Sequence, residues 1–292
     1  MIQQIWNGLS IGAAYGLIAI GYTLIFGVIQ VIFFAQGELS MLAAFAALGM
    51  VVLLSSTGIP LPIMILVAIA VGIAASCAAG LAAERVAIRP LRHAPRVKPL
   101  ITSLGMSIVY QNLILILVGP QPVAFNTGWI PSRWEFAGVR MNSVEVIMIG
   151  SLLACTFALE AFLRRNRYGL AIRSIAQSGA GARLMGVSPE RTTALTFGIA
   201  SLTGGIAGLL LAFYYGVIRF DMGFVPGIKG FTIAILGGVG NVQGAVVAAV
   251  LVGVAEALFA SYVSSDYRDV LVFGLLIVML IVRPHGLLGE GE

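Results

Sequence analysis

The sequence has few charged side chains for its length. Only 10% of its 292 residues are charged, whereas 59% are hydrophobic and the mean hydropathy is +1.02. A soluble domain usually carries about 25% charged residues. So few charges cannot coat a soluble body of this size, and the composition predicts a membrane protein.

Residues for several kinds of chemistry are also missing. Of the two lysines, Lys98 and Lys229, neither lies in a G-x-x-x-x-G-K-[ST] loop that could hold ATP. A nucleophile elbow, an H-E-x-x-H helix and a CxxC pair are absent as well. The two cysteines, Cys77 and Cys155, lie in apolar runs and are predicted to be small buried thiols. We expect no catalytic residue, no metal site, no cofactor and no enzyme activity in this chain.

Long apolar runs are abundant. A spanning helix needs about 20 mainly apolar residues, which predicts an all-α, polytopic integral membrane protein with about eight transmembrane helices. The start lacks the basic region of a signal peptide and its apolar run is long, so we expect a retained first helix. The whole chain, 1–292, is predicted to form one transmembrane domain. The expected helices cover about 5–26, a stretch ending near 54, 61–83, 100–118, 143–163, 189–215, 242–262 and 270–282.

Two apolar stretches are interrupted. The weakly polar residues 35–40 precede the second helix, and Gly237 to Asn241 break a short apolar run, 231–238, which we expect to be a re-entrant half-helix. The stretch 216–230 before it is predicted to be an outer loop. Paired interruptions of this kind point to a transport site near the membrane midplane. Whether the two halves form an internal repeat stays open.

The basic residues are concentrated in two loops. The loops 84–99 and 164–191 hold eleven of the seventeen arginines and lysines, so both are predicted to be cytoplasmic. The segment 119–142 between them mixes aromatic and charged residues, as expected at the outer interface. Three crossings before residue 84 place the N-terminus outside. If 231–238 counts as a crossing, the C-terminus lies inside. The net charge of +5 then reflects topology, and no nucleic-acid partner is expected.

Two acids, Glu38 and Glu256, lie within apolar stretches. A charge at membrane depth is costly, so each should face a cavity, find a partner or be protonated. They are candidates for lining a substrate route. The alternative is that they lie near a helix end or form hydrogen bonds across helices.

The segment 164–191 carries six arginines and one acid. Its arginines alone indicate only topology. Beyond that, a compact run of small residues offers Leu184 and Met185 as an apolar anchor for a partner, and Gly186 turns the chain before a helix start at Ser188. The segment is therefore either a docking site or only a topological marker.

The sequence resembles a known family over nearly its whole length. The matching stretches are 7–42, 84–112, 164–201, 222–269 and 283–289, in that order. They resemble the permease subunits of branched-chain amino acid ABC importers of the LivH type. The family usually has asparagine, histidine and aspartate where this chain has Phe33, Gln36 and Glu38, which leaves the exact substrate open.

The resemblance implies a membrane permease subunit of an ATP-driven importer for branched-chain or other neutral amino acids, in the bacterial inner membrane. It implies four kinds of partner: membrane lipid, a second permease subunit in a heterodimer, two cytoplasmic ATPase subunits that hold ATP and magnesium, and a periplasmic binding protein. The run 178–187 would be the coupling helix that contacts the ATPase. The residues concerned are Ser178, Ala182, Arg183, Leu184, Met185, Gly186 and Val187 for coupling, and Gln36, Glu38, Asn241 and Glu256 for the translocation path.

Three alternatives stay open from the sequence. An ABC permease for urea or short amides is the first. An ion-coupled secondary transporter is the second, although two scattered acids would make a thin proton relay. A structural membrane scaffold is the third, and the interrupted helices argue mildly against it.

Overall fold

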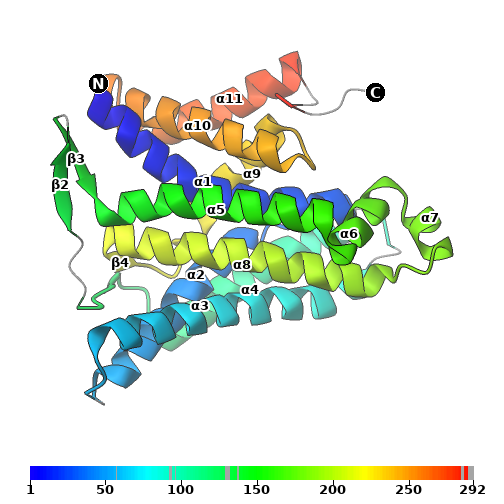
Figure 1. The fold of residues 1–292 in the computed structure, drawn as a ribbon, viewed down its shortest axis with the longest axis horizontal. Helices are drawn as coiled ribbons and strands as arrows, with labels where there is room; N and C mark the ends of the chain where they lie inside the picture. The colour runs from blue at the N-terminus through cyan, green and yellow to red at the C-terminus, as the bar shows by residue number, and fades with distance from the viewer. Residues whose placement is uncertain are drawn as a thin grey trace.

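The helices run side by side along the longest axis of the molecule (Figure 1). The structure, a computed structural model, describes residues 1–56, 58–91, 94–95, 97–128, 132–136, 138–283 and 286–288. Three residues of the first basic loop, 92, 93 and 96, lie outside this described part.

Seven helices of the described part are long and apolar enough to cross a membrane. They are α1 (Ile2–Ile29), α2 (Gln36–Ser55), α3 (Leu61–Ala83), α4 (Val97–Val118), α5 (Ser143–Arg165), α8 (Pro189–Tyr215) and α10 (Val242–Tyr262). The eighth expected helix, α11 (Arg268–Val282), has only 15 residues. The expectation of an all-α, polytopic membrane protein with an interrupted segment is confirmed.

Shorter elements connect these helices. A π-turn, η1 (Glu84–Ile88), and a 3-10 turn, η2 (Arg89–Leu91), continue α3. The remaining elements are α6 (Arg167–Gln177), α7 (Gly179–Leu184), α9 (Phe224–Gly237), β1 (Val123–Ala124), β2 (Arg133–Phe136), β3 (Val139–Asn142) and β4 (Val217–Ile218). The strands form two short antiparallel pairs, β1 with β4 and β2 with β3.

The two ends of the bundle differ in their elements and charge. The N-terminus and the β2–β3 hairpin lie at one end, and α6 and α7 lie at the other (Figure 1). The turn η1 belongs to the α7 end, because Ile88 and Arg183 line the same hollow and Arg89 pairs with Glu190. The positive-inside rule predicts that this arginine-rich end faces the cytoplasm. We refer to it as the cytoplasmic end and to the β2–β3 end as the outer end.

Helix α1 occupies the centre of the bundle. It packs against α10, α8, α9 and α5, and its residues from Ala13 to Ile25 are all buried. Small residues permit the close approach to α10: a Cβ atom on Gly12 would lie 2.6 Å from the carbonyl oxygen of Ala249. A second apolar core joins α2, α3 and α8. Since α1 contacts so many helices, a shift of α1 would affect most of the bundle.

One boundary differs from the sequence prediction. Helix α9 begins at Phe224, so the predicted outer loop 216–230 is wrong in its second half. Pro226 fits there because the first residues of a helix have no intrahelical acceptor for their N–H groups. Lys229 fits because carboxylates lie beside it. The chain therefore re-enters the bundle earlier than its polar residues suggested.

Candidate functional site

The N-terminal ends of α2 and α9 meet inside the bundle. A Cβ atom on Gly37 would lie 2.4 Å from the carbonyl oxygen of Gly223 and 2.7 Å from Cα of Gly227, so only glycine fits at this contact. The Gln36 side chain donates to the carbonyl oxygen of Ala200 at 2.8 Å. Ala200 lies near the middle of α8, which places both helix starts at mid-depth rather than at the surface.

Glu38 lies at this meeting point and is buried, with 1% of its surface exposed. Its Oε1 atom accepts hydrogen bonds from Ser107 Oγ at 3.1 Å and Gln111 Nε2 at 2.7 Å, both on α4. Its Oε2 atom has no hydrogen-bond partner in the described part of the chain, and the same holds for Oε1 of Gln36. Two buried acceptors without partners among the described residues therefore lie two residues apart in the first turn of α2.

Aromatic rings border the same point. The hydroxyl of Tyr22 donates to the carbonyl oxygen of Phe34 at 3.4 Å. The ring of Phe231, on α9, lies 5.9 Å from the ring of Tyr22 and 5.8 Å from that of Phe34, measured between centroids. An apolar surface thus adjoins the carboxylate.

Glu256 has very different surroundings. Its Oε1 atom lies 2.7 Å from Nζ of Lys229, and the same nitrogen lies 2.7 Å from Oδ1 of Asp269. Lys229 is 1% exposed and also lies over the ring of Tyr15, at 5.3 Å from its centroid. This ion cluster joins α9, α10 and α11. The sequence does not predict this cluster, because Lys229 falls in the predicted outer loop 216–230. A lysine buried at membrane depth calls for an acidic partner.

Asn241 lies at the cytoplasmic end, between α9 and α10. Its Oδ1 atom accepts from the backbone N–H of Gly244 at 3.0 Å and caps α10. Its Nδ2 atom donates to the carbonyl oxygen of Leu288 at 2.8 Å. It also borders a hollow of about 830 Å³ that Arg164 and Arg173 help to line. Of the four predicted path residues, the structure brings together only Gln36 and Glu38.

The predicted coupling residues form a short helix at the far cytoplasmic end (Figure 1). Ser178 is its N-cap, because its Oγ atom accepts from the backbone N–H of Gly181 at 3.1 Å. Ala182 faces inward and is 4% exposed, whereas Leu184 and Met185 are 89% and 84% exposed. Large apolar side chains so open to water mark a surface that suits a partner.

A Schellman motif ends α7. The N–H of Val187 donates to the carbonyl oxygen of Ala182, and the N–H of Gly186 donates to that of Arg183, both at 3.0 Å. Gly186 has φ +82°, which glycine adopts without strain. The inner side of α7 and Val187 pack with Ile172 and other apolar residues of α1 and α6. Helix α7 is therefore seated on the bundle and not a loose loop.

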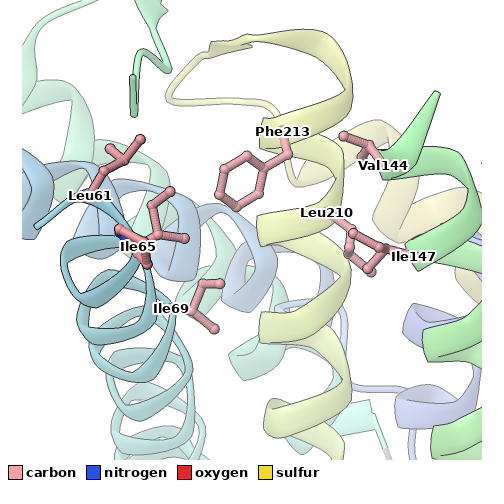
Figure 2. A pocket seen from close by; sticks show the side chains of 8 residues that line it. Leu61, Ile65, Ile69, Val144, Ile147, Leu210 and Phe213 are labelled. Atoms are coloured by element: carbon pink, nitrogen blue, oxygen red, sulfur yellow. The ribbon is translucent and has the colours of Figure 1, made fainter. Parts of the chain in front are cut away.

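An apolar groove of about 360 Å³ lies in the outer half, between α3, α5 and α8 (Figure 2). None of the residues that line this groove carries a charge that could orient a zwitterionic amino acid. The lining is apolar and is suited to hydrocarbon groups. The lining residues are Leu61, Pro62, Ile65, Ile69, Val144, Ile147, Leu210 and Phe213.

A multi-pass bundle in which two interrupted helices meet at a buried acid has the architecture of a membrane transport protein. A family described as branched-chain amino acid transport system, permease component, matches residues 4–280. The chain belongs to this family.

Individual relatives agree with this family. The high-affinity branched-chain amino acid transport system permease proteins LivH of Escherichia coli K12 and BraD of Pseudomonas aeruginosa are each 40% identical over 297 residues, covering 100% of this chain and 96% of theirs. A probable branched-chain amino acid transport permease protein LivH of Methanocaldococcus jannaschii is 25% identical over 94% of this chain and 88% of its own. These matches favour the importer permease over an ion-coupled transporter or a urea permease.

Proposed function

We propose that this chain is the permease subunit of an ATP-driven importer that carries branched-chain or other neutral amino acids across a bacterial inner membrane. The observation that carries the proposal is α7, a capped and seated helix that presents Leu184 and Met185 at the arginine-rich end. Such an anchor suits a groove on a partner. The names of the relatives, which describe branched-chain amino acid transport systems, support the substrate class.

The proposal assigns the energy source to other chains. Two ATPase subunits at the α7 end hold ATP and magnesium, and a periplasmic binding protein delivers the amino acid at the β2–β3 end. A second permease subunit completes the pore. In this arrangement Ser178 and Gly186 hold the shape of α7, while Arg183, Leu184 and Met185 contact the ATPase.

The proposal places the translocation path at the meeting point of α2 and α9, beside Gln36 and Glu38. Glu256 has Lys229 as its partner and Asn241 caps α10, so both are proposed to support the path from outside it. Helix ends inside the bundle suit this role, because the short helix α9 can move there without unfolding a complete spanning helix.

A physical route joins α7 to this point. Ala182 of α7 packs in one cluster with Val28 of α1. Further along α1, a Cβ atom on Gly230 of α9 would lie 2.7 Å from the side chain of Ile18. We propose that movement of the ATPases pushes α7 and shifts α1 as a rigid body, which changes access to the ends of α2 and α9.

The test is reconstitution of the complete complex in vesicles. Labelled L-leucine should enter when ATP is supplied on the α7 side and the binding protein on the other side. It should not enter under a proton or sodium gradient in vesicles that hold this chain without the ATPases. Gradient-driven uptake by the chain without the ATPases would overturn the proposal.

Competition identifies the substrate class in the same vesicles. Unlabelled isoleucine and valine should reduce leucine uptake when the cognate binding protein is present. Competition by urea or acetamide, with none by the amino acids, would instead favour the amide permease.

A further inference from the structure

We propose that Glu38 binds the ammonium group of the transported amino acid. This inference rests on the proposed function and gives one residue of the path a chemical task. It starts from the buried carboxylate oxygen Oε2, which has no hydrogen-bond partner among the described residues.

A buried carboxylate needs compensation for the water it has lost. Glu256 also has one oxygen, Oε2, without a hydrogen-bond partner among the described residues, but its Oε1 atom lies 2.7 Å from the ammonium group of Lys229. In Glu145, which is 8% exposed, Oε2 accepts from Nε1 of Trp6 at 2.7 Å. Glu38 has two neutral donors on one oxygen and none on the other. It is therefore prepared to accept a further donor, and a cation is the strongest one.

Basic side chains of this region are already engaged. Lys229, five residues into α9, lies 2.7 Å from both Glu256 and Asp269. Arg219, in the loop before α9, lies 3.0 Å from Asp221. In the described part of the chain, no arginine or lysine forms an ion pair with Glu38. The described part of the chain therefore gives Glu38 no cationic partner, and we infer that the substrate supplies one.

The surroundings of Glu38 also fit the carboxylate and the side chain of an aliphatic amino acid. A Cβ atom on Gly223, the N-cap of α9, would lie 2.9 Å from Oε2 of Glu38, so the positive end of a 14-residue helix faces the carboxylate. Such a helix end favours an anion. When α9 moves away, it can accept the substrate carboxylate while Glu38 takes the ammonium group. The rings of Tyr22, Phe34 and Phe231 adjoin this point and offer an apolar surface to the side chain.

The first experiment uses the complete reconstituted complex. Glu38→Gln keeps the shape but loses the charge, so leucine uptake at saturating binding protein should fall about tenfold or more, the effect of losing a charge-assisted hydrogen bond. Glu38→Asp should retain part of the rate. The control, Asp266→Asn in the exposed loop between α10 and α11, also removes one carboxylate and should match wild type. Wild-type uptake by Glu38→Gln overturns the inference but leaves the proposed function intact.

The second experiment needs no variant and stays decisive if Glu38→Gln does not fold. The thermal stability of the purified wild-type complex is measured with three probes that share the leucine side chain. Isopentylamine, which keeps only the amine, should raise the melting temperature, whereas 4-methylpentanoate and the uncharged 3-methylbutanol should not. An equal effect of all three probes, or of none, would show that Glu38 binds no ammonium group.

Discussion

At the scale of single residues, the two buried acids Glu38 and Glu256 differ in their partners. Glu256 shares Lys229 with Asp269, whereas Glu38 has only the neutral donors Ser107 and Gln111. A buried ion pair that loses one member is strongly destabilised, because the remaining charge has no compensation. The same kind of side chain therefore supports stability at one position and is proposed to bind substrate at the other.

Replacing Lys229 should destabilise the protein. Lys229→Met leaves the buried Glu256 with only the long contact to Arg268, at 4.0 Å. Breaking a buried pair in this way should cost about 3–5 kcal/mol and lower the melting temperature in detergent. Arg140→Met, at an exposed arginine of the hairpin, is the control and should have little effect. A second change, Glu256→Met, should restore part of the loss. A melting temperature of Lys229→Met equal to wild type would exclude a stabilising ion cluster.

The two acids could be singled out from the sequence, but their partners could not. Glu38 and Glu256 stand out because acids are rare in apolar stretches. Ser107 and Gln111 lie about seventy positions from Glu38 in the sequence, and only the packing of α4 on α2 brings them together. The sequence predicts Lys229 to lie in an outer loop, because the two acids that neutralise it, on α10 and α11, come later in the chain.

At the scale of elements, α9 depends on a segment at the end of the chain. The N–H groups of Leu287 and Leu288 donate to the carbonyl oxygens of Leu236 and Gly237, at 2.8 and 3.1 Å. These carbonyls belong to the last turn of α9, where no N–H group of the helix donates to them. Gly286, with φ +80°, would place a Cβ atom 2.5 Å from Gly238. The segment 286–288 thus caps α9.

Disturbing this cap should loosen the α9–α10 turn. In Gly286→Val, a side chain meets the backbone of Gly238 at a strained φ, so the segment should detach. Hydrogen exchange measured by mass spectrometry should then become faster over residues 235–241. The control is Gly274→Val in α11, where no atom lies within 4 Å of the added Cβ. Unchanged exchange in Gly286→Val would mean that the cap does not hold the turn.

Most helix boundaries followed from apolar run length. The predicted start at Pro189 and the predicted helix 242–262 agree with α8 and α10 as found. The start of α9 could not be predicted, because Lys229 and Pro226 resemble loop residues until their surroundings are known. The β2–β3 hairpin was not predicted either, since residues 119–142 were recognised only as an interfacial segment.

At the scale of the whole molecule, charge sets the orientation. Helices α6 and α7 share one end, and the hairpin and N-terminus share the other (Figure 1). The basic loop after α3 joins the α7 end, because its Arg89 pairs with Glu190. The positive-inside rule then gives an outer N-terminus and a cytoplasmic α7. The sequence alone predicts the same orientation, because the rule needs only the loops and the number of crossings.

Cysteine labelling tests the orientation. In a chain with Cys77 and Cys155 replaced by alanine, a membrane-impermeant maleimide should label Arg140→Cys in cells with an intact inner membrane. Met185→Cys should react only after that membrane is opened. Both positions are well exposed, so accessibility within the protein does not limit either reaction. The reverse pattern would invert the topology and place α7 away from any cytoplasmic ATPase.

The most direct test concerns α7 as the point where energy enters. Gly186→Trp puts a bulky side chain at φ +82° beside Leu184 and Met185, while Gly138→Trp makes the same change at φ +79° in the β2–β3 turn. Leucine uptake and ATP hydrolysis are measured together in the reconstituted complex. We predict that uptake by Gly186→Trp falls close to background while hydrolysis continues, and that Gly138→Trp keeps both. Wild-type uptake per ATP in Gly186→Trp would contradict the proposed coupling through α7.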